Sequence, residues 1–329
     1  MSSSTSETPA ITPRQTMRGH TGTVRHVVHM PGGRRIITSS FDGSLRLWDI
    51  KSGTQIGEDW RDEKSKASSI ALSPNGEIVA SGCDDGKVRL WDIETRKVIA
   101  TWIGHGSVVD ALCWSADGER VASGSWDGTA RVWDIKTGQN ILTIKTKWIW
   151  VVTYSPDSSK LATGGDEENA VKIWDAKTGE LLNILKHDRR VMCLAWTSDG
   201  KKLISGSFDP IRIFDTATWQ QIAVLEGHTQ RITSISLSSN NRLLVSASWD
   251  KTARLWNLDT CLPVGPPLHH EGFLDSAALS PDGKVLATAC VNHNAYTWDV
   301  YAILKEAGLE DLLPVRTGPH RIDGKRPKY

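Results

Sequence analysis

Cysteine is scarce in this chain and follows no spacing that would pair it. The five cysteines, an odd number, are scattered from Cys83 to Cys290, and no C-x-x-C pair occurs. A disulfide framework needs an even set of cysteines, and a thiolate metal site needs closely spaced ones. The sequence therefore indicates neither, and it fits a reducing intracellular compartment.

Long apolar runs are also missing. No stretch approaches the roughly 20 apolar residues that cross a bilayer. The N-terminal residues, MSSSTSETPA, lack the apolar segment of a secretory signal. We therefore expect no membrane association and an intracellular location, cytoplasmic, nuclear or both.

Neither sign of charge is in excess. The chain has 39 Lys and Arg residues against 38 Asp and Glu residues, which gives a net charge of +1. A balanced chain has no global field that would draw it to nucleic acid. This balance disfavours nucleic acid as the main partner.

What the sequence does contain is a pair that is Trp-Asp or similar to it and recurs seven times along the chain. Successive pairs are separated by 43, 42, 41, 40, 42 and 42 residues. The seven pairs are Trp48-Asp49, Trp91-Asp92, Trp133-Asp134, Trp174-Asp175, Phe214-Asp215, Trp256-Asn257 and Trp298-Asp299. A period of about 40 to 45 residues is typical of propeller blades of four strands, which bury their apolar faces only against neighbours.

One repeat shows how such a blade would fold. In residues 104–144, alternating apolar runs are separated by the turn clusters SADG, SWDG and KTG, which predicts four short antiparallel strands. Residues 246–257 (SASWDKTARLWN) repeat residues 123–134 (SGSWDGTARVWD) at most positions. The sequence therefore predicts an all-β fold, a seven-bladed β-propeller of four-stranded antiparallel blades.

With these motifs, the chain resembles the WD40 family over about residues 11 to 300. In that family a His, a Ser or Thr, a turn Asp and a Trp of one blade form a hydrogen-bonded tetrad. The resemblance assigns structural tetrads to blades one, three and six, each with 28 residues from His to Trp. They are His20, Thr38, Asp42 and Trp48; His105, Ser123, Asp127 and Trp133; and His228, Ser246, Asp250 and Trp256.

The other blades depart from this pattern. Blade five has Phe214, which has no indole N–H, and blade seven has Asn292 at the acid position. Blade two has Glu63 in place of the histidine, and blade four has no histidine at all. These blades are expected to rely more on packing, because one net hydrogen bond contributes only about 0.5–1.5 kcal/mol.

The Ser, His and Asp residues also suggest a catalytic triad. A triad is needed once, in a cleft, whereas this set recurs wherever the fold repeats. No phosphate-binding loop, dinucleotide fingerprint, zinc-protease motif or nucleophile elbow is present. The adjacent His269 and His270, and the pair His26 and His29, lack further ligands for a metal. We therefore expect no catalytic residue, no metal and no cofactor.

The ends of the chain are expected to close the ring. The last repeat has no fourth strand after Trp298, and residues 11–17 stand where the outer strand of a preceding blade would lie. A shared blade removes the open sheet edges of the ring. Residues 301–313 have near-helical apolar spacing before Pro314, which predicts a short amphipathic helix. It would pack on the rim of the last blade or dock into a partner.

The two remaining segments are short. Residues 1–10 are rich in Ser and Thr and are expected to be disordered. Residues 314–329 carry five basic residues against one acid, Asp323, and are expected to form a flexible basic tail.

The resemblance also implies where partners bind. In WD40 proteins this is often the narrow face, built from residues before the turn acids and at the entries of the first strands. Carried over, these positions give the aromatic–arginine crown: Arg25, Phe41, Trp126, Trp148, Trp150, Arg190, Phe208, Arg231, Trp249 and Phe273. Tryptophan and arginine are enriched at interface centres. By contrast, Trp114 and Trp196 occupy matching first-strand positions and are expected in the core.

Several functions remain open on this evidence. The favoured one is a non-catalytic scaffold or adaptor, a monomeric ring within a larger complex, that binds other proteins or peptide motifs. Nearby acids, Asp84, Asp110, Glu167 and Asp275, would favour partner segments that contain Lys or Arg. A component of a nucleic-acid or ribonucleoprotein complex is the alternative, and an enzyme is the least favoured.

Overall fold

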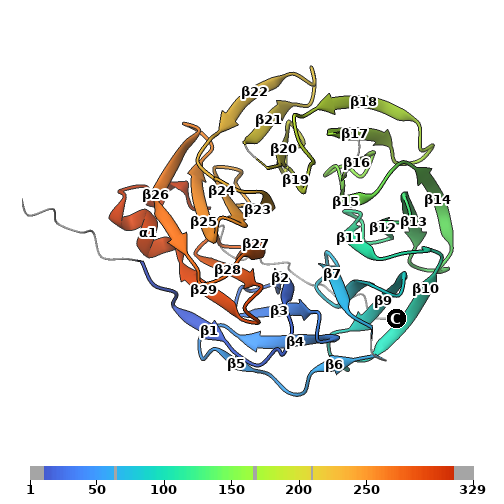
Figure 1. Cartoon of the computed structure of the whole chain (residues 1–329), viewed down its shortest axis with the longest axis horizontal. Helices are drawn as coiled ribbons and strands as arrows, with labels where there is room; N and C mark the ends of the chain where they lie inside the picture. Colours follow the sequence, from blue (N-terminus) through green and yellow to red (C-terminus); the bar gives the residue numbers. More distant parts are fainter. Residues whose placement is uncertain (1–10, 63–64, 166–168, 209, 315–329) are drawn as a thin grey trace, which may run out of the picture.

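Seven antiparallel sheets stand around a central axis in the computed structural model (Figure 1). The structure describes residues 11–62, 65–165, 169–208 and 210–314. The predicted all-β fold, a seven-bladed propeller, is confirmed. The N-terminal segment 1–10 and all but the first residue of the basic tail lie outside the described residues.

Each blade is a meander in which consecutive strands pair. In blades one to three the strands are β2 (Val24–His29), β3 (Arg35–Ser40), β4 (Ser44–Asp49), β5 (Thr54–Gln55) and β6 (Trp60–Arg61); β7 (Ala67–Leu72), β8 (Ile78–Cys83), β9 (Lys87–Asp92) and β10 (Val98–Ile103); and β11 (Val109–Trp114), β12 (Arg120–Ser125), β13 (Thr129–Asp134) and β14 (Asn140–Lys145).

Blades four to seven follow the same order. Their strands are β15 (Ile149–Tyr154), β16 (Lys160–Gly165), β17 (Ala170–Asp175) and β18 (Leu181–Lys186); β19 (Cys193–Trp196), β20 (Lys202–Gly206), β21 (Ile211–Asp215) and β22 (Gln221–Leu225); β23 (Ile232–Leu237), β24 (Leu243–Ser248), β25 (Thr252–Asn257) and β26 (Leu262–His269); and β27 (Leu274–Leu279), β28 (Val285–Cys290), β29 (Ala295–Asp299) and β1 (Gln15–Met17).

Strand sequences reflect the position of the strand in the blade. Every residue of β24, LLVSAS, is buried, because both faces of a central strand meet neighbouring blades. The outer strand β14, NILTIK, alternates between exposed and more buried residues because one face meets solvent. Blade one is irregular at this position, since β4 pairs first with β5 and then with β6.

The core lies between blades rather than within them. One apolar cluster joins Ala122 and Val132 of blade three to Ile149 and Trp174 of blade four. The fit is tight, because a Cβ atom added to Gly124 would lie 2.5 Å from Ile149 Cγ2. A single blade therefore cannot be stable alone, as expected for stacked repeats.

The first strand of the chain closes the ring, as predicted. In Figure 1, β1 lies beside β29, and it completes the sheet of blade seven. The register pairs Gln15 with Thr297 and Met17 with Ala295. Met17 is 1% exposed and packs in the cluster that joins blades seven and one.

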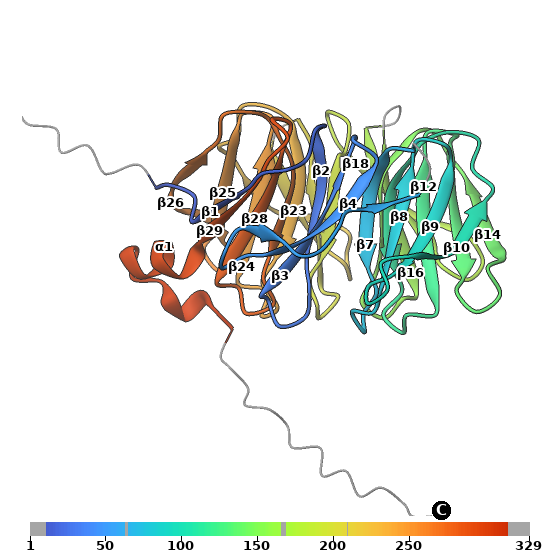
Figure 2. The ribbon, with the colours of Figure 1, turned by 90° about the horizontal axis from the view of Figure 1, so that it is seen from below.

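The C-terminal helix is shorter than expected and packs on the propeller. α1 spans Val300–Glu306, and a 3-10 turn, η1, follows at Glu310–Leu312. Gly308, with φ 67°, separates the two pieces, because a left-handed residue ends a helix. Figure 2 shows α1 on the outside of the ring. Ile303, Leu304 and Leu312 are buried against blades six and seven, so α1 packs on the ring rather than projecting from it.

Candidate partner-binding face

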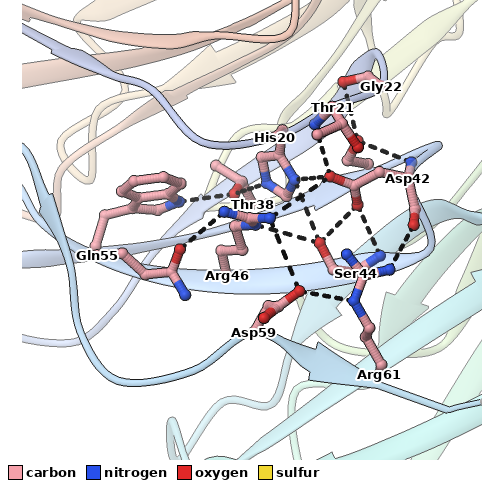
Figure 3. Close-up of polar contacts among 12 residues, drawn as sticks. His20, Thr21, Gly22, Thr38, Asp42, Ser44, Arg46, Gln55, Asp59 and Arg61 are labelled. Carbon is pink, nitrogen blue, oxygen red and sulfur yellow. Dashed lines mark hydrogen bonds and ion pairs between the residues drawn. The ribbon is translucent and has the colours of Figure 1, made fainter.

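A hydrogen-bonded chain holds the loops at one end of blade one (Figure 3). Trp48 Nε1 donates to Thr38 Oγ1 at 2.8 Å, Thr38 Oγ1 meets His20 Nε2 at 2.8 Å, and His20 Nδ1 meets Asp42 at 2.8 Å. An ionised Asp42 carboxylate can only accept, so His20 Nδ1 carries the proton of this contact. Burial lowers the pKa of His20, which favours the neutral ring, and Nε2 then accepts the Thr38 hydroxyl hydrogen.

Burial and hydrogen bonds set the charges of this chain. Burial lowers the pKa of His20, although Asp42 opposes the change. Burial alone would raise the pKa of Asp42, but hydrogen bonds from His20 and Ser44 hold that pKa well below its usual range. The acid therefore stays ionised, and it also accepts from the Thr21 backbone N–H at 3.0 Å. As a result, the loop with His20 and Thr21 and the turn with Asp42 are both fixed to strand β3, which carries Thr38.

The structure brings the residues of the other two tetrads together in the same way. In blade three, His105 lies 2.9 Å from Asp127 and 2.7 Å from Ser123, which accepts from Trp133 at 2.8 Å. In blade six, the corresponding distances are 2.7, 2.7 and 2.9 Å for the links His228–Asp250, His228–Ser246 and Trp256–Ser246.

In blade two a buried arginine binds the turn acid, as Arg46 does from the same strand position of blade one. Arg89 is 1% exposed, and its guanidinium binds Asp62 at 2.7 Å and Asp85 at 2.8 Å. Burial lowers the pKa of Arg89, but hydrogen bonds to these two acids raise it overall. Trp91 Nε1 still donates to Ser81 at 2.8 Å. Glu63, which stands at the histidine position in the sequence, lies outside the described residues.

The remaining blades keep only parts of the chain. His187 of blade five and His270 of blade seven bind the expected hydroxyls, and the second ring nitrogen of each meets a backbone carbonyl instead of an acid. Asp209, the expected acid of blade five, lies outside the described residues. In blade seven, Asn292 turns to the Tyr296 hydroxyl at 2.6 Å.

The centre of the face is an ion pair that joins three blades. Arg25, at the entry of β2, binds Asp275 of blade seven at 2.8 Å and Asp110 of blade three at 3.2 Å. Both acids are at most 7% exposed. Burial raises the pKa of Asp110 despite the nearby Arg25. The two acids therefore already have a cation, which limits their use for a basic partner.

Two aromatic groups of the crown lie on opposite sides of this ion pair. Trp126 lies 6.3 Å from Trp148, with their ring planes 20° apart, and 5.8 Å from Trp150. Across the face, Trp249 stacks on Phe273 at 5.0 Å and 9°. Trp126 and Trp148 are 37% and 49% exposed, and Phe273 is 39% exposed.

Cations accompany the aromatic side chains. The Arg231 guanidinium lies over the Trp249 ring, and Arg25 lies 5.1 Å from the Phe41 ring centre. Lys66 also approaches Phe41, at 5.6 Å, and Lys251 approaches Phe273, at 5.8 Å. These two lysines were missed by sequence reasoning, since they lie just outside the positions that the family pattern marks.

The remaining residues of the crown, and the remaining acids near it, lie at the edge of the face. Phe208 is half-buried and Arg190 is exposed. Asp84 accepts from Ser65 and from the Lys66 backbone N–H, and Glu167 lies outside the described residues. Within the face, a cavity of about 260 Å³ is lined by Arg25, Asp110 and Trp150, among others. The crown is therefore a set of aromatic and basic side chains around a shallow central opening.

Metal ligands do not gather in the part of the chain that the structure describes. No group of three or more His, Cys, Asp or Glu side chains there could hold an ion. Among the same residues, no helix is both long and apolar enough to cross a membrane.

Comparison with known proteins identifies the repeats. Seven segments match the family model for the WD domain, G-beta repeat: residues 11–49, 60–92, 96–134, 138–175, 179–210, 219–257 and 264–299. The chain belongs to the WD40 family. The first matched segment, residues 11–49, begins before β1, which is the outer strand of blade seven, and ends in blade one. A WD40 repeat of the sequence therefore contains the outer strand of one blade and the inner strands of the next blade.

Relatives within the WD40 family match only part of the chain. Periodic tryptophan protein 2 homolog of Neurospora crassa is 31% identical over 136 residues, which are 41% of this chain and 15% of the relative. U4/U6 small nuclear ribonucleoprotein PRP4 of Saccharomyces cerevisiae is 37% identical over 81 residues, 24% of this chain and 17% of the relative.

A third relative is closer to this chain in length. Small ribosomal subunit protein RACK1 of Drosophila melanogaster is 32% identical over 77 residues, 23% of this chain and 24% of the relative. Because the alignments cover at most 24% of these three relatives, they establish shared WD40 repeats and carry no activity over to this chain.

Proposed function

We propose that this WD40 propeller is a non-catalytic scaffold that binds partner proteins or peptide motifs through its aromatic–arginine crown. The observation that carries the proposal is the exposed pair Trp126 and Trp148, at 37% and 49%. Their stacked rings project at the face where the tetrads hold the loops rigid. Large rigid aromatic surfaces of this kind are typical of interface centres.

The geometry favours recognition by aromatic faces over recognition by net charge. Asp110 and Asp275 are occupied by Arg25, so a partner cation gains little from these two acids. A Lys or Arg of a partner could instead stack on Trp126 and Trp148, with about 0.5–1 kcal/mol gained at such exposed sites. A partner segment that carries a basic side chain remains the favoured ligand.

The tetrad hydroxyls are unsuited to catalysis, which supports a non-catalytic role. Ser123 and Ser246 are 0% exposed. Each already accepts from an indole N–H and contacts a histidine nitrogen. A nucleophile must reach a substrate carbonyl from a cleft, and these oxygens cannot.

A second candidate is a role inside a ribonucleoprotein assembly. It is favoured by the names of two relatives, one a small nuclear ribonucleoprotein and one a small ribosomal subunit protein. In such an assembly this chain would contact protein components, since its charge is balanced at +1.

The test is a comparison of bound partners between the wild type and a Trp126→Ala, Trp148→Ala variant. Both would be captured from native cells, with and without ribonuclease, and the partners measured by quantitative mass spectrometry. We expect the variant to fold, because both side chains are exposed, and to lose most partners. Partners lost after ribonuclease would indicate the ribonucleoprotein role. Retention of every partner by the folded variant would refute the crown as the binding surface.

A further inference from the structure

A second recessed site lies at the opposite end of the ring, between blades four and five. Its walls are the turn after β15 and the turns at the far ends of β19 and β21. The cavity measures about 420 Å³ and is lined by Trp196, Trp219, Asp157, Lys160 and Asp199, among others. The crown lies at the other ends of these strands, because both Trp148 and Arg190 precede the first strands of their blades.

Two tryptophans form the apolar part of this site. Trp196 was expected in the core, but it is only half-buried, as is its counterpart Trp114. The rings of Trp196 and Trp219 lie edge to face, 6.1 Å apart with an angle of 78°. Both rings pack on the core between blades four and five and leave part of their surface to the cavity.

Trp219 occupies a left-handed turn position that differs between blades. It is the fourth residue after the blade's acid, with φ 58°. Blades one, three and four have glycine there, at Gly53, Gly138 and Gly179, whereas blades two and six have Arg96 and Cys261, with φ 61° and 59°. A left-handed conformation costs a side-chain-bearing residue about 1–2 kcal/mol. Of these six blades, blade five alone has a tryptophan at this position.

The indole N–H of Trp196 has no acceptor among the described residues. Its Nε1 atom is buried without a hydrogen-bond partner. At the equivalent position of blade three, Trp114 Nε1 donates to the Ala71 carbonyl of the neighbouring blade at 3.0 Å. A buried donor without an acceptor costs about 1–3 kcal/mol. Because this nitrogen is buried, a ligand in the cavity would meet the ring surface of Trp196 rather than its N–H.

The polar rim of the cavity is acidic on balance. Hydrogen bonds from Ser155 and Ser159 lower the pKa of Asp157 to about 2, and a hydrogen bond from Thr197 lowers the pKa of Asp199. Both carboxylates are exposed and ionised at neutral pH. They outnumber the single lysine of the lining, Lys160. The rim therefore complements a basic residue.

We propose that this cavity binds an extended, proline-containing peptide segment with a flanking Arg or Lys. A polyproline II segment is extended and has no internal hydrogen bonds to break when it binds. Its flat pyrrolidine rings suit tryptophan surfaces, as in other aromatic-lined grooves. The basic residue would lie against Asp157 and Asp199.

The test uses the full chain and a synthetic peptide, Ala-Arg-Pro-Pro-Ala-Pro-Pro-Ala, titrated by calorimetry. Two control peptides replace every proline by alanine, or the arginine by glutamate. We expect measurable binding of the first peptide and binding at least about ten-fold weaker for each control, equivalent to about 1.4 kcal/mol. No binding of the first peptide, or equal binding of the alanine control, would overturn the proposal.

Protein variants then locate the binding. Trp219→Gly has the residue found at this turn in three other blades, so it should fold while binding about ten-fold or more weakly. Trp196→Phe keeps an aromatic ring but reduces the ring surface that lines the cavity, which should weaken binding about two- to ten-fold. Circular dichroism and thermal melting check the fold of each.

An outer-strand variant, Ile103→Ala, is the matched control, because Ile103 is 78% exposed on β10 and belongs to neither the crown nor the cavity. It should bind the peptide as the wild type does. A crown variant, Trp148→Ala, tests the competing site, since the crown is itself proposed to take a basic side chain. Binding that is lost in Trp148→Ala but kept in Trp219→Gly and Trp196→Phe would place the peptide on the crown and overturn the proposal.

Discussion

At the residue scale, polar side chains hold the turn acid of a blade in place. In blades one, three and six a histidine links a hydroxyl to that acid. In blade two, Arg89 binds the turn acid Asp85 and also Asp62. These contacts satisfy buried polar atoms while they hold loops of the face in place. The energetic consequence can be measured one residue at a time.

Replacing His105 by alanine should destabilise the protein by about 1–3 kcal/mol, because Ser123 and Asp127 lose a hydrogen-bonding partner. Urea-induced unfolding, followed by circular dichroism, measures the change. His269→Ala is the control, since His269 is exposed, and it should leave the free energy of unfolding nearly unchanged. Equal effects of the two substitutions would contradict the structural role of the tetrad.

Replacing Arg89 by methionine should cost about 1–3 kcal/mol. Asp62 and Asp85 are 36% and 26% exposed at the side chain, so water recovers part of their lost solvation and limits the effect. Arg35→Met, at an exposed position of β3, serves as the control in the same unfolding experiment. A stable Arg89→Met protein would show that blade two does not need the Arg89 ion pairs.

At the element scale, β1 acts as a clasp. It belongs to the start of the chain but completes the last blade, next to β29. Met17 fills a position in the cluster between blades seven and one. Three residues of strand therefore cover a sheet edge that would otherwise be open to other chains.

Deleting residues 1–17 should lower the melting temperature strongly or abolish cooperative unfolding, whereas deleting residues 1–9 should not. The longer deletion removes the β1 pairing and Met17, while the shorter one ends before β1. Differential scanning calorimetry of the two proteins, with size-exclusion chromatography to detect aggregation, is the measurement. Matching transitions would show that the ring does not need the clasp.

At the scale of the whole molecule, burial of histidines couples folding to pH. Burial lowers the pKa of His29 and of His270 to about 4. Unfolded histidines titrate near a pKa of about 6.5. Between these values the unfolded chain binds protons that the folded chain excludes, so stability falls as the pH falls.

The free energy of unfolding should therefore decrease between about pH 6.5 and about pH 4, by up to about 1.4 kcal/mol per histidine for each unit of pKa difference. Urea titrations at several pH values in this window test it. A His29→Leu variant removes one titrating group whose ring nitrogens are buried without partners, so its stability should depend less on pH. A flat profile for the wild type would refute the coupling.

Local patterns were enough to predict the repeat, the number of blades and the closure by the first strand: a period near 42 residues, turn residues at fixed offsets and alternating apolar runs. The tetrad positions came from the resemblance to the WD40 family. The helix was also predicted, but its extent was too long, because Gly308 takes up a left-handed conformation that ends α1.

The contacts between side chains of different blades are visible only in the folded ring. Arg25 binds Asp110 and Asp275, which lie 85 and 250 residues away in the chain. Those pairings change the expected role of the two acids, and no periodic pattern encodes them. The sequence pattern likewise identifies Trp196 only as a first-strand residue, and it does not single out Trp219. Their cavity exists because two blades stack at a fixed angle and distance, which depends on the packing of the whole ring.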